Sequence, residues 1–107
     1  MMNRGDIYWV DLSPTQGSEI KKIRPCVLIG ATPINKARST VVVVPLSTSG
    51  KPRPPLVIPL QCDGKGVVAV CDQIRSVDKS RLRKQVGELS TSDLASLDDS
   101  LRQVLSL

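Results

Sequence analysis

Residues 40–46 (TVVVVPL) are the stretch that decides the fold of this chain. They contain an unbroken apolar run, from Val41 to Val44. A strand of this composition has no polar face to turn toward water, so the stretch predicts a central strand that is covered on both faces. The run is far shorter than the ~20 apolar residues that span a bilayer. We therefore expect no membrane span and, because the chain opens without a basic-then-apolar leader, a cytoplasmic protein.

Shorter β-rich segments flank this strand along the chain. They are residues 6–12 and 26–30 before it, and residues 56–60, 67–71, 73–77 and 86–89 after it. The intervening residues 31–39 carry an early proline and allow at most one or two helical turns. Because adjacent strand residues face opposite sides, at most one of Tyr8 and Trp9 can face a ligand, and we expect Trp9 to lie in the core.

The chain ends in a segment of a different kind, one amphipathic helix. Its apolar residues recur at three- and four-residue steps: Leu94, Leu97, Leu101, Val104 and Leu105. Ser90 precedes them as an N-cap, and Asp93 follows in the first turn. Several short strands followed by one helix predict a compact, mostly β barrel. The length of 107 residues suffices for one domain, residues 1–107.

The composition removes several kinds of chemistry. The chain contains no histidine, which excludes Ser-His and Cys-His nucleophile pairs and zinc sites built on histidine. Its three cysteines, Cys26, Cys62 and Cys71, have no CxxC spacing and lie in apolar segments, so we interpret them as buried structural thiols. No cluster has metal-ligand spacing, and we expect neither a metal nor another cofactor. Any catalysis then rests on Arg, Lys, Asp, Glu, Ser, Thr or Tyr.

Positive charge is concentrated in the first part of the chain. Fifteen Lys and Arg residues stand against 10 Asp and Glu residues, for a net charge of +5. Residues 90–107 hold one of these bases and three of the acids, which leaves 14 bases and 7 acids, a net +7, in residues 1–89. Such a field favours a polyanion or an acidic protein as partner, although a basic surface can also serve solubility alone.

Two loop segments carry residues suited to binding or catalysis. In the first, Glu19 and Arg24 flank a loop-to-strand junction, and Pro25 restricts Arg24 to an extended conformation. This pair of residues is consistent with either a binding or catalytic site or a loop held by a salt bridge. The second is residues 45–51 (PLSTSGK), where hydroxyls and bases close to one another can hold a phosphate, although a plain Ser/Gly turn has the same composition. Its hydroxyls and the bases that follow are Ser47, Thr48, Ser49, Lys51 and Arg53.

A third segment, residues 71–76 (CDQIRS), follows an apolar strand. It contains the acid–amide pair Asp72 and Gln73. Such a pair can read the edge of a nucleobase or accept a proton. Asp72 can equally form an ion pair with Arg75, so both interpretations stay open.

Together these stretches resemble the MazF/PemK/Kid family of toxin endoribonucleases. The similar stretches keep the expected order and spacing over essentially the whole chain: residues 5–12 (GDIYWVDL), 14–19 (PTQGSE), 24–27 (RPCV), 45–49 (PLSTS) and 72–76 (DQIRS). The resemblance implies a homodimer of SH3-like small barrels, of the CcdB/Kid/MazF type, each with a C-terminal α-helix. It also implies an mRNA interferase that cleaves single-stranded RNA at short sequences, acts independently of ribosomes and is inhibited by an acidic antitoxin.

The resemblance also assigns roles to particular residues. By position, Arg24 and Thr48 match the family's catalytic arginine and hydroxyl residue. Glu19 matches the loop acid near the RNA path, and Asp72 and Gln73 match the acid–amide pair that lines the groove. Four neighbours complete the expected RNA-binding set: Ser47, Ser49, Lys51 and Arg53.

The implied chemistry needs neither histidine nor metal. RNA supplies the nucleophile, its 2′-hydroxyl, whose in-line attack on the adjacent phosphorus leaves a 2′,3′-cyclic phosphate and a 5′-hydroxyl. A fixed guanidinium such as that of Arg24 stabilises the charge that develops on the phosphoryl oxygens, and Thr48 can donate to the same phosphate. Glu19 or Asp72 can accept the proton. In the Kid branch a catalytic arginine stands two residues before the aspartate; that position is Val70 in this chain, which favours the MazF-type arrangement.

Two other functions stay open. A CcdB-like gyrase poison has the same barrel but acts through its C-terminal helix, including an aromatic residue near the end, whereas this chain ends in QVLSL (residues 103–107). A passive SH3-like nucleic-acid binder would need only the basic surface. With one Trp, one Tyr and no Phe, such binding would depend on charge and hydrogen bonds more than on stacking. Cleavage of RNA in vitro distinguishes the three functions.

Overall fold

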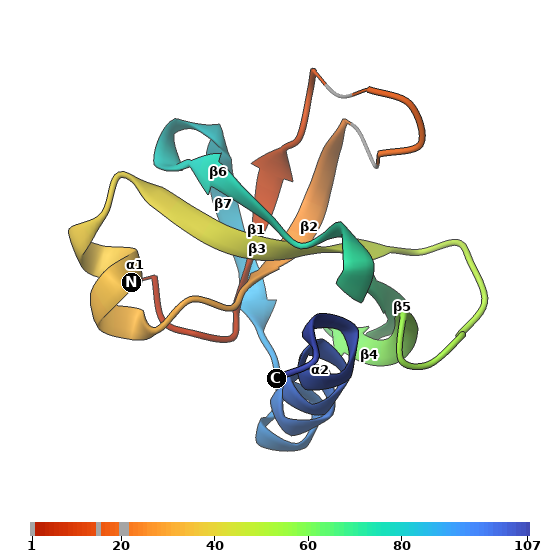
Figure 1. Cartoon of the computed structure of the whole chain (residues 1–107). Coiled ribbons are helices and arrows are strands. Elements are labelled where there is room, and N and C mark those ends of the chain that lie inside the picture. The colour runs from red at the N-terminus through yellow and green to blue at the C-terminus, as the bar shows by residue number, and fades with distance from the viewer. Residues whose placement is uncertain (1, 15, 20–21) are drawn as a thin grey trace.

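The computed structural model describes residues 2–14, 16–19 and 22–107 of the chain. The elements of this part are, in chain order, β1 (Asp6–Asp11), β2 (Ile23–Leu28), α1 (Thr32–Ala37), β3 (Thr40–Ser47), β4 (Val57–Cys62), β5 (Lys65–Val70), η1 (Cys71–Gln73), β6 (Arg75–Asp78), η2 (Lys79–Arg81), β7 (Leu82–Glu88) and α2 (Thr91–Leu105). The strands form one curled sheet in the order β4-β5-β3-β2-β1-β7, with β6 paired to β3 (Figure 1). This is the mostly β architecture with a C-terminal helix that the sequence predicts.

The central strand is β3, as residues 40–46 predict. One of its edges pairs with β2, where Cys26 lies opposite Pro45. Its other edge pairs first with β6, which places Arg75 opposite Val43, and then with β5 through Leu46 and Ser47. Because two strands share this edge in succession, the sheet changes direction along β3 (Figure 1).

Two apolar clusters lie on the two sides of β3. Val44 and Leu46 face the first cluster, which α2 covers with Leu97. Val41 and Val43 face the second cluster. Each of these four β3 side chains is at most 2% exposed, whereas Val42 is 36% exposed, so the predicted coverage of both faces is confirmed only from Val43 onward. The alternation follows the two-residue period of a strand.

The start of α2 is capped as predicted. The Ser90 hydroxyl accepts a hydrogen bond from the backbone N–H of Asp93 at 3.1 Å. The Asp93 carboxylate in turn accepts from the backbone N–H of Gln61 at 2.9 Å, which ties the helix to the edge strand β4. Within the described residues, no helix has both the length and the apolar character needed to cross a membrane.

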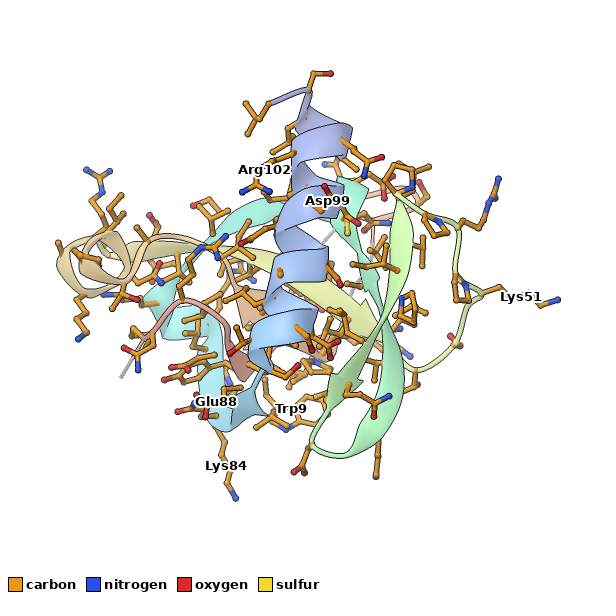
Figure 2. All side chains as sticks on the ribbon, turned by 90° about the horizontal axis from the view of Figure 1, so that it is seen from below. Trp9, Lys51, Lys84, Glu88, Asp99 and Arg102 are labelled. Atoms are coloured by element: carbon orange, nitrogen blue, oxygen red, sulfur yellow. The ribbon has the colours of Figure 1, made fainter. Side chains whose placement is uncertain are left out.

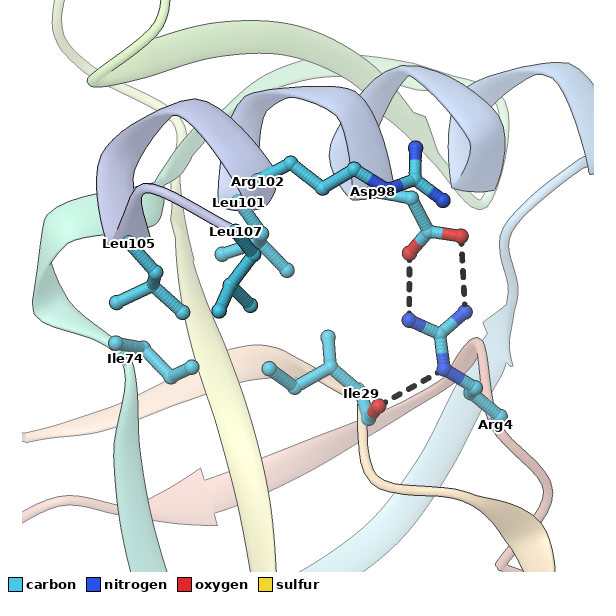
Figure 3. Close-up of a pocket in the computed structure, with 8 residues that line it drawn as sticks. All are labelled: Arg4, Ile29, Ile74, Asp98, Leu101, Arg102, Leu105 and Leu107. Atoms are coloured by element: carbon cyan, nitrogen blue, oxygen red, sulfur yellow. Dashed lines mark hydrogen bonds and ion pairs between the residues drawn. The ribbon is translucent and has the colours of Figure 1, made fainter.

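An ion pair holds the middle of α2 against the sheet. The two terminal nitrogens of Arg4 contact the Asp98 carboxylate at 3.2 and 2.5 Å, and Arg4 Nε donates to the carbonyl of Ile29 at 2.9 Å (Figure 3). One guanidinium therefore joins three parts of the chain: the segment before β1, the end of β2 and the helix. Fork-to-fork pairing of this kind adds geometric specificity to the charge attraction.

Three sequence expectations are wrong in detail. Trp9 is 40% exposed instead of buried, because it lies in an open hollow whereas its neighbour Tyr8 packs in the second cluster (Figure 2). The strand expected over residues 73–77 is interrupted by the 3₁₀ turn η1, which redirects the chain from β5 to β6 along the same edge of β3. The strand expected over residues 86–89 begins earlier, at Leu82, where pairing with Val10 outweighs the polar composition of β7.

We expect Arg4→Ala to lower the free energy of unfolding by about 1–2 kcal/mol, because the Asp98 carboxylate and the Ile29 carbonyl both lose their donor. The half-exposed position of the pair keeps the effect below that of a buried charge. Urea denaturation is the measurement, and Arg102→Ala in the exposed last turn of α2 is the matched control. Equal stabilities of the two variants would contradict this role of Arg4.

Candidate active site

Arg24 is the second residue of β2 and lies directly after the β1–β2 loop. It is half-buried and pairs across the ladder with Val10, and the next pair joins Pro25 to Trp9. Proline fixes its own backbone and restricts the residue before it, so the sequence itself holds the Arg24 backbone extended. The predicted position of Arg24 at a strand entrance, outside the apolar run, is confirmed.

Two guanidinium groups lie on the same side of the sheet. Strand alternation puts Arg24 on the side of Cys26, and Arg75 lies opposite Val43, which faces the same second cluster. Burial raises the pKa of the Cys26 thiol to about 12, and the positive charges of Arg75 and Arg24 act in the opposite direction. Both guanidinium groups are therefore close enough to this thiol to influence it. Arg75 did not appear among the predicted site residues.

The hydroxyls of residues 47–49 divide between two sides of the sheet. Strand alternation along β3 puts Ser47 on the side of Pro45, which is also the side of Cys26 and Arg24. The Ser47 hydroxyl donates to the carbonyl of Ser49 at 2.7 Å and accepts from the Ser49 N–H at 3.2 Å. This side chain is 9% exposed and closes the turn that follows β3.

Thr48 lies on the other side, in the hollow that also contains Trp9. This hollow, of about 170 Å³, is lined by Pro25 and Lys65 together with apolar residues of the strands. Because Pro25 and Arg24 are adjacent in β2, they point to opposite sides. The structure therefore brings Ser47 rather than Thr48 to the side of the sheet that carries Arg24.

The carboxylate of Glu19 closes the tip of the β1–β2 loop. Its Oε1 atom accepts from the backbone N–H of Gln16 at 2.7 Å, and the Glu19 N–H donates to the Gln16 carbonyl at 3.2 Å. This reciprocal pair forms a closed turn in which Glu19 acts on the backbone of its own loop. The motif of residues 14–19 also includes Thr15, which lies outside the described residues.

The acid–amide pair lies in η1, the 3₁₀ turn between β5 and β6. Asp72 is exposed and Gln73 is half-buried. Burial raises the pKa of the preceding Cys71 thiol to about 11, and the negative charge of Asp72 raises it further. The turn therefore presents Asp72 to solvent while Cys71 anchors it in the first cluster.

The remaining predicted bases lie on the loop between β3 and β4. Lys51 and Arg53 are both exposed, and Lys51 points away from the body of the molecule (Figure 2). The backbone of Arg53 exchanges hydrogen bonds with that of Val57 at 2.7 and 3.1 Å, which closes the loop ahead of β4. These two bases follow the Ser47–Ser49 turn along the chain and place positive charge on its exposed side.

A role for residues 78–81 (DKSR) was not predicted from the sequence. Arg81 Nη1 donates to the carbonyl of Asp11 at 3.2 Å and to that of Ser13, and Arg83 forms an ion pair with Asp11 at 3.5 Å. An acid followed by Lys-Ser-Arg before an apolar residue is typical of a capped turn that presents a basic side chain. This sequence pattern could have predicted the capped turn. It could not have predicted that Arg81 contacts the carbonyls of Asp11 and Ser13, because those contacts depend on strand register.

Two further features complete the description of the site region. Another hollow, of about 450 Å³, lies between the Arg4–Asp98 pair and the end of α2, where Ile29, Ile74 and Leu105 line it (Figure 3). Among residues 2–14, 16–19 and 22–107, no group of three Cys, Asp or Glu side chains is arranged to hold a metal ion.

Comparisons with known proteins agree on one family. Residues 3–105 match the family model described as PemK-like, MazF-like toxin of type II toxin-antitoxin system. The chain is 36% identical to the endoribonuclease MazF of Staphylococcus epidermidis, over all of this chain and 93% of that protein. It is 34% identical to endoribonuclease MazF9 of Mycobacterium tuberculosis, over all of this chain and 98% of that protein.

Solved structures show the same fold. The crystal structure of MazF from Deinococcus radiodurans superposes with a TM-score of 0.87 at 24% identity, covering 98% of this chain and 96% of that one. A mycobacterial endoribonuclease in complex with its cognate antitoxin superposes with a TM-score of 0.82 at 21% identity, covering 98% and 95% of the two chains. The fold is therefore the small barrel of the MazF type.

The sequence matches then define the family within this fold. The chain belongs to the PemK-like, MazF-like toxins of type II toxin-antitoxin systems. The expected resemblance is confirmed, and the comparisons fit the endoribonuclease function rather than a CcdB-like gyrase poison.

We expect the buried thiols to make stability depend on pH above neutrality. The folded chain holds Cys26 and Cys71 protonated up to about pH 12 and 11, whereas thiols ionise near pH 9 once unfolded. Their contribution is therefore complete below pH 9 and is lost as the pH rises from about 9 toward 11–12.

The measurement is the free energy of unfolding in urea at pH 7, 9 and 10.5, for the native chain and for a variant with Cys26→Ala and Cys71→Ala. The variant lacks both thiols, so the difference in stability between the two proteins should shrink as the pH rises. A difference that is the same at all three pH values contradicts the assignment.

Proposed function

We propose that this toxin cleaves single-stranded RNA at short sequences by attack of the 2′-hydroxyl on the adjacent phosphorus, with Arg24 as the central catalytic residue. Its endoribonuclease activity follows from the family and from the relatives named above. The observation that supports this site is the set of groups on the side of the sheet to which Arg24 points. There a half-buried guanidinium on a restricted backbone shares its side of the sheet with a second guanidinium, that of Arg75, and with Ser47.

Arginine suits this chemistry because its planar fork can donate two hydrogen bonds to one phosphate. In-line attack adds negative charge to the phosphoryl oxygens, so a fixed guanidinium binds the transition state more strongly than the ground state. The reaction then needs a proton acceptor for the 2′-hydroxyl, and Glu19 and Asp72 are the acids that the resemblance offers. A side-by-side assay of Glu19→Gln and Asp72→Asn decides between them.

The partners of the toxin are proposed from charge and from the family. We propose single-stranded RNA as substrate, an acidic antitoxin that binds the basic part of the chain, and a homodimer, in the cytoplasm. The 14 bases against 7 acids in residues 1–89 support both anionic partners. The mycobacterial relative with its cognate antitoxin is in line with such a complex. Residues 1–107 act in this proposal as one toxin domain.

The test of the proposed function is incubation of the pure protein with a long RNA in excess EDTA. We expect cuts at a recurring short sequence, with 2′,3′-cyclic phosphate and 5′-hydroxyl ends, because RNA supplies the nucleophile and arginine the charge. Intact RNA, or cleavage that appears only after magnesium is added, rejects this mechanism.

In the same assay, Arg24→Ala should lower the cleavage rate by about 10²–10³-fold or more, because the donors to the developing phosphoryl charge are lost. Arg24→Lys should also be severely impaired, since an ammonium keeps the charge but not the fork. Thermal melting checks that both variants fold, and Arg102→Ala is the control for loss of a positive charge elsewhere. Full activity of Arg24→Ala would reject the site.

The two candidate hydroxyls can be separated by substitution. We expect Ser47→Ala to slow cleavage more than Thr48→Val, because strand alternation puts Ser47 on the side of Arg24 and its hydroxyl holds the turn after β3 through Ser49. A misplacement of about 1 Å at the site, once this turn is released, can cost on the order of 10²-fold in rate. The measurement is the rate with saturating RNA. A larger loss of cleavage rate in Thr48→Val than in Ser47→Ala would contradict this expectation and support Thr48 as the catalytic hydroxyl residue, as the resemblance implies.

A further inference from the structure

The side chain of Arg81 donates hydrogen bonds to the edge of β1 and the residues after it, beyond the point where pairing with the backbone of β7 ends. The β1–β7 register runs from Asp6 opposite Glu88 to Val10 opposite Leu82. Beyond that pair the chain of η2 turns away, and Arg81 Nη1 donates to the carbonyls of Asp11, at 3.2 Å, and Ser13. Asp11 is the last residue of β1 and Ser13 follows two residues later, so their carbonyls continue the alternation along the same edge. A guanidinium therefore supplies the donors that another strand would otherwise provide.

The other edge of the same three residues leads to Arg24. The backbone N–H of Leu12 donates to the Lys22 carbonyl at 3.0 Å, and the Lys22 N–H donates to the Ser13 hydroxyl at 3.2 Å. The pairs Asp11–Ile23 and then Val10–Arg24 follow in the β1–β2 register. Residues 11–13 thus form a bridge with Arg81 on one edge and the entrance of β2 on the other.

Arg81 is itself held in a fixed turn. The Asp78 carboxylate accepts from the backbone N–H of Ser80 at 2.9 Å and caps η2. Hydrogen bonds from Ser80 lower the pKa of Asp78, so the cap stays ionised at neutral pH. A second guanidinium, that of Arg75, reaches the intervening Leu12 carbonyl at a long 3.5 Å. The base of the loop is therefore contacted by arginines from β6 and η2.

We propose that Arg81 is a positioning residue, which holds residues 11–13 and thereby the β1–β2 loop and the Arg24 backbone in the geometry that RNA cleavage requires. This inference rests on the proposed function for its catalytic consequence and on the hydrogen bonds for its structural one. A misplacement of about 1 Å at a reacting group can cost on the order of 10²-fold in rate. Because Arg81 donates to carbonyls, it acts without contacting a phosphate.

The chain offers a direct probe of the loop. Its two glutamates are Glu19, at the tip of the β1–β2 loop, and Glu88, at the end of β7. The protease Glu-C cleaves after glutamate, so the rate of cleavage after Glu19 reports how firmly the base of the loop is held. Mass spectrometry of the fragments distinguishes the two cut sites. This readout is independent of RNA.

The experiment compares the native chain with Arg81→Ala, Arg81→Lys and Lys84→Ala. Lys84 is an exposed base of β7 and serves as the matched control for loss of charge (Figure 2). We expect Arg81→Ala to be cut after Glu19 about 10-fold faster and to cleave RNA about 10- to 100-fold more slowly in kcat, with KM nearly unchanged. Arg81→Lys keeps one donor and should recover most of both losses. Lys84→Ala should match the native chain in both.

Salt dependence separates positioning from phosphate binding. An arginine that contacts phosphate lowers the slope of log affinity against log salt concentration by about 1 when it is removed, whereas a positioning residue leaves this slope unchanged. A reduced slope for Arg81→Ala, or native rates of Glu-C cleavage and of kcat, overturns the proposal. If Arg81→Ala does not melt cooperatively, Arg81→Lys decides by the same three readouts. Absence of RNA cleavage by the native chain would reject the proposed function, and the Glu-C comparison would still test the loop.

Discussion

The pairing of β3 along both of its edges is the interaction on which the rest of this structure depends. The strand holds one row of side chains in each apolar cluster, so its backbone is shielded from water on both faces. Backbone N–H and C=O groups in such a position must be paired, because an unsatisfied buried group costs about 1–3 kcal/mol. β2 on one side, and β6 followed by β5 on the other, meet that requirement.

The succession of β6 and β5 on one edge of β3 also determines where the proposed site forms. At the end of β3 the partner strands diverge, and the chain leaves the sheet through the Ser47–Ser49 turn. The same change of partner requires the turn η1, which carries Asp72 and Gln73. The entrance of β2 with Arg24 lies at this end of the ladder. Polar residues from three distant parts of the sequence therefore lie at strand ends and turns, where regular pairing stops.

Much of this fold was predictable because strong local patterns and tertiary contacts agree. The valines of residues 41–44 favour a strand in the sheet interior. The Ser90 cap and the leucines of α2 favour an amphipathic helix that begins directly after Ser90. The exposure of Trp9 was not predictable in this way. Both Ile7 and Trp9 alternate to the side of the first cluster, and only the curl of the other strands decides that Ile7 is covered and Trp9 lies in a hollow.

The proposed site shows the same limit. Arg24 and its extended backbone follow from the Arg-Pro sequence, which acts locally. The sides on which Ser47 and Thr48 lie relative to Arg24 depend instead on the register between β2 and β3, which the local sequence does not determine. Likewise, the partners of Arg81 depend on where the β1–β7 register stops. Residue type indicated the available chemistry, and register decided which groups meet.

In a chain without histidine, arginine serves several different purposes, and the acceptor that each guanidinium faces distinguishes them. Arg4 faces the carboxylate of Asp98 and joins the helix to the sheet, whereas Arg81 faces backbone carbonyls and replaces a missing strand. Arg24 differs from these two in sharing its side of the sheet with a second guanidinium, that of Arg75. Two like charges repel one another, and an anion that binds between them relieves this repulsion, which is the electrostatic reason for proposing that a phosphate binds on this side of the sheet.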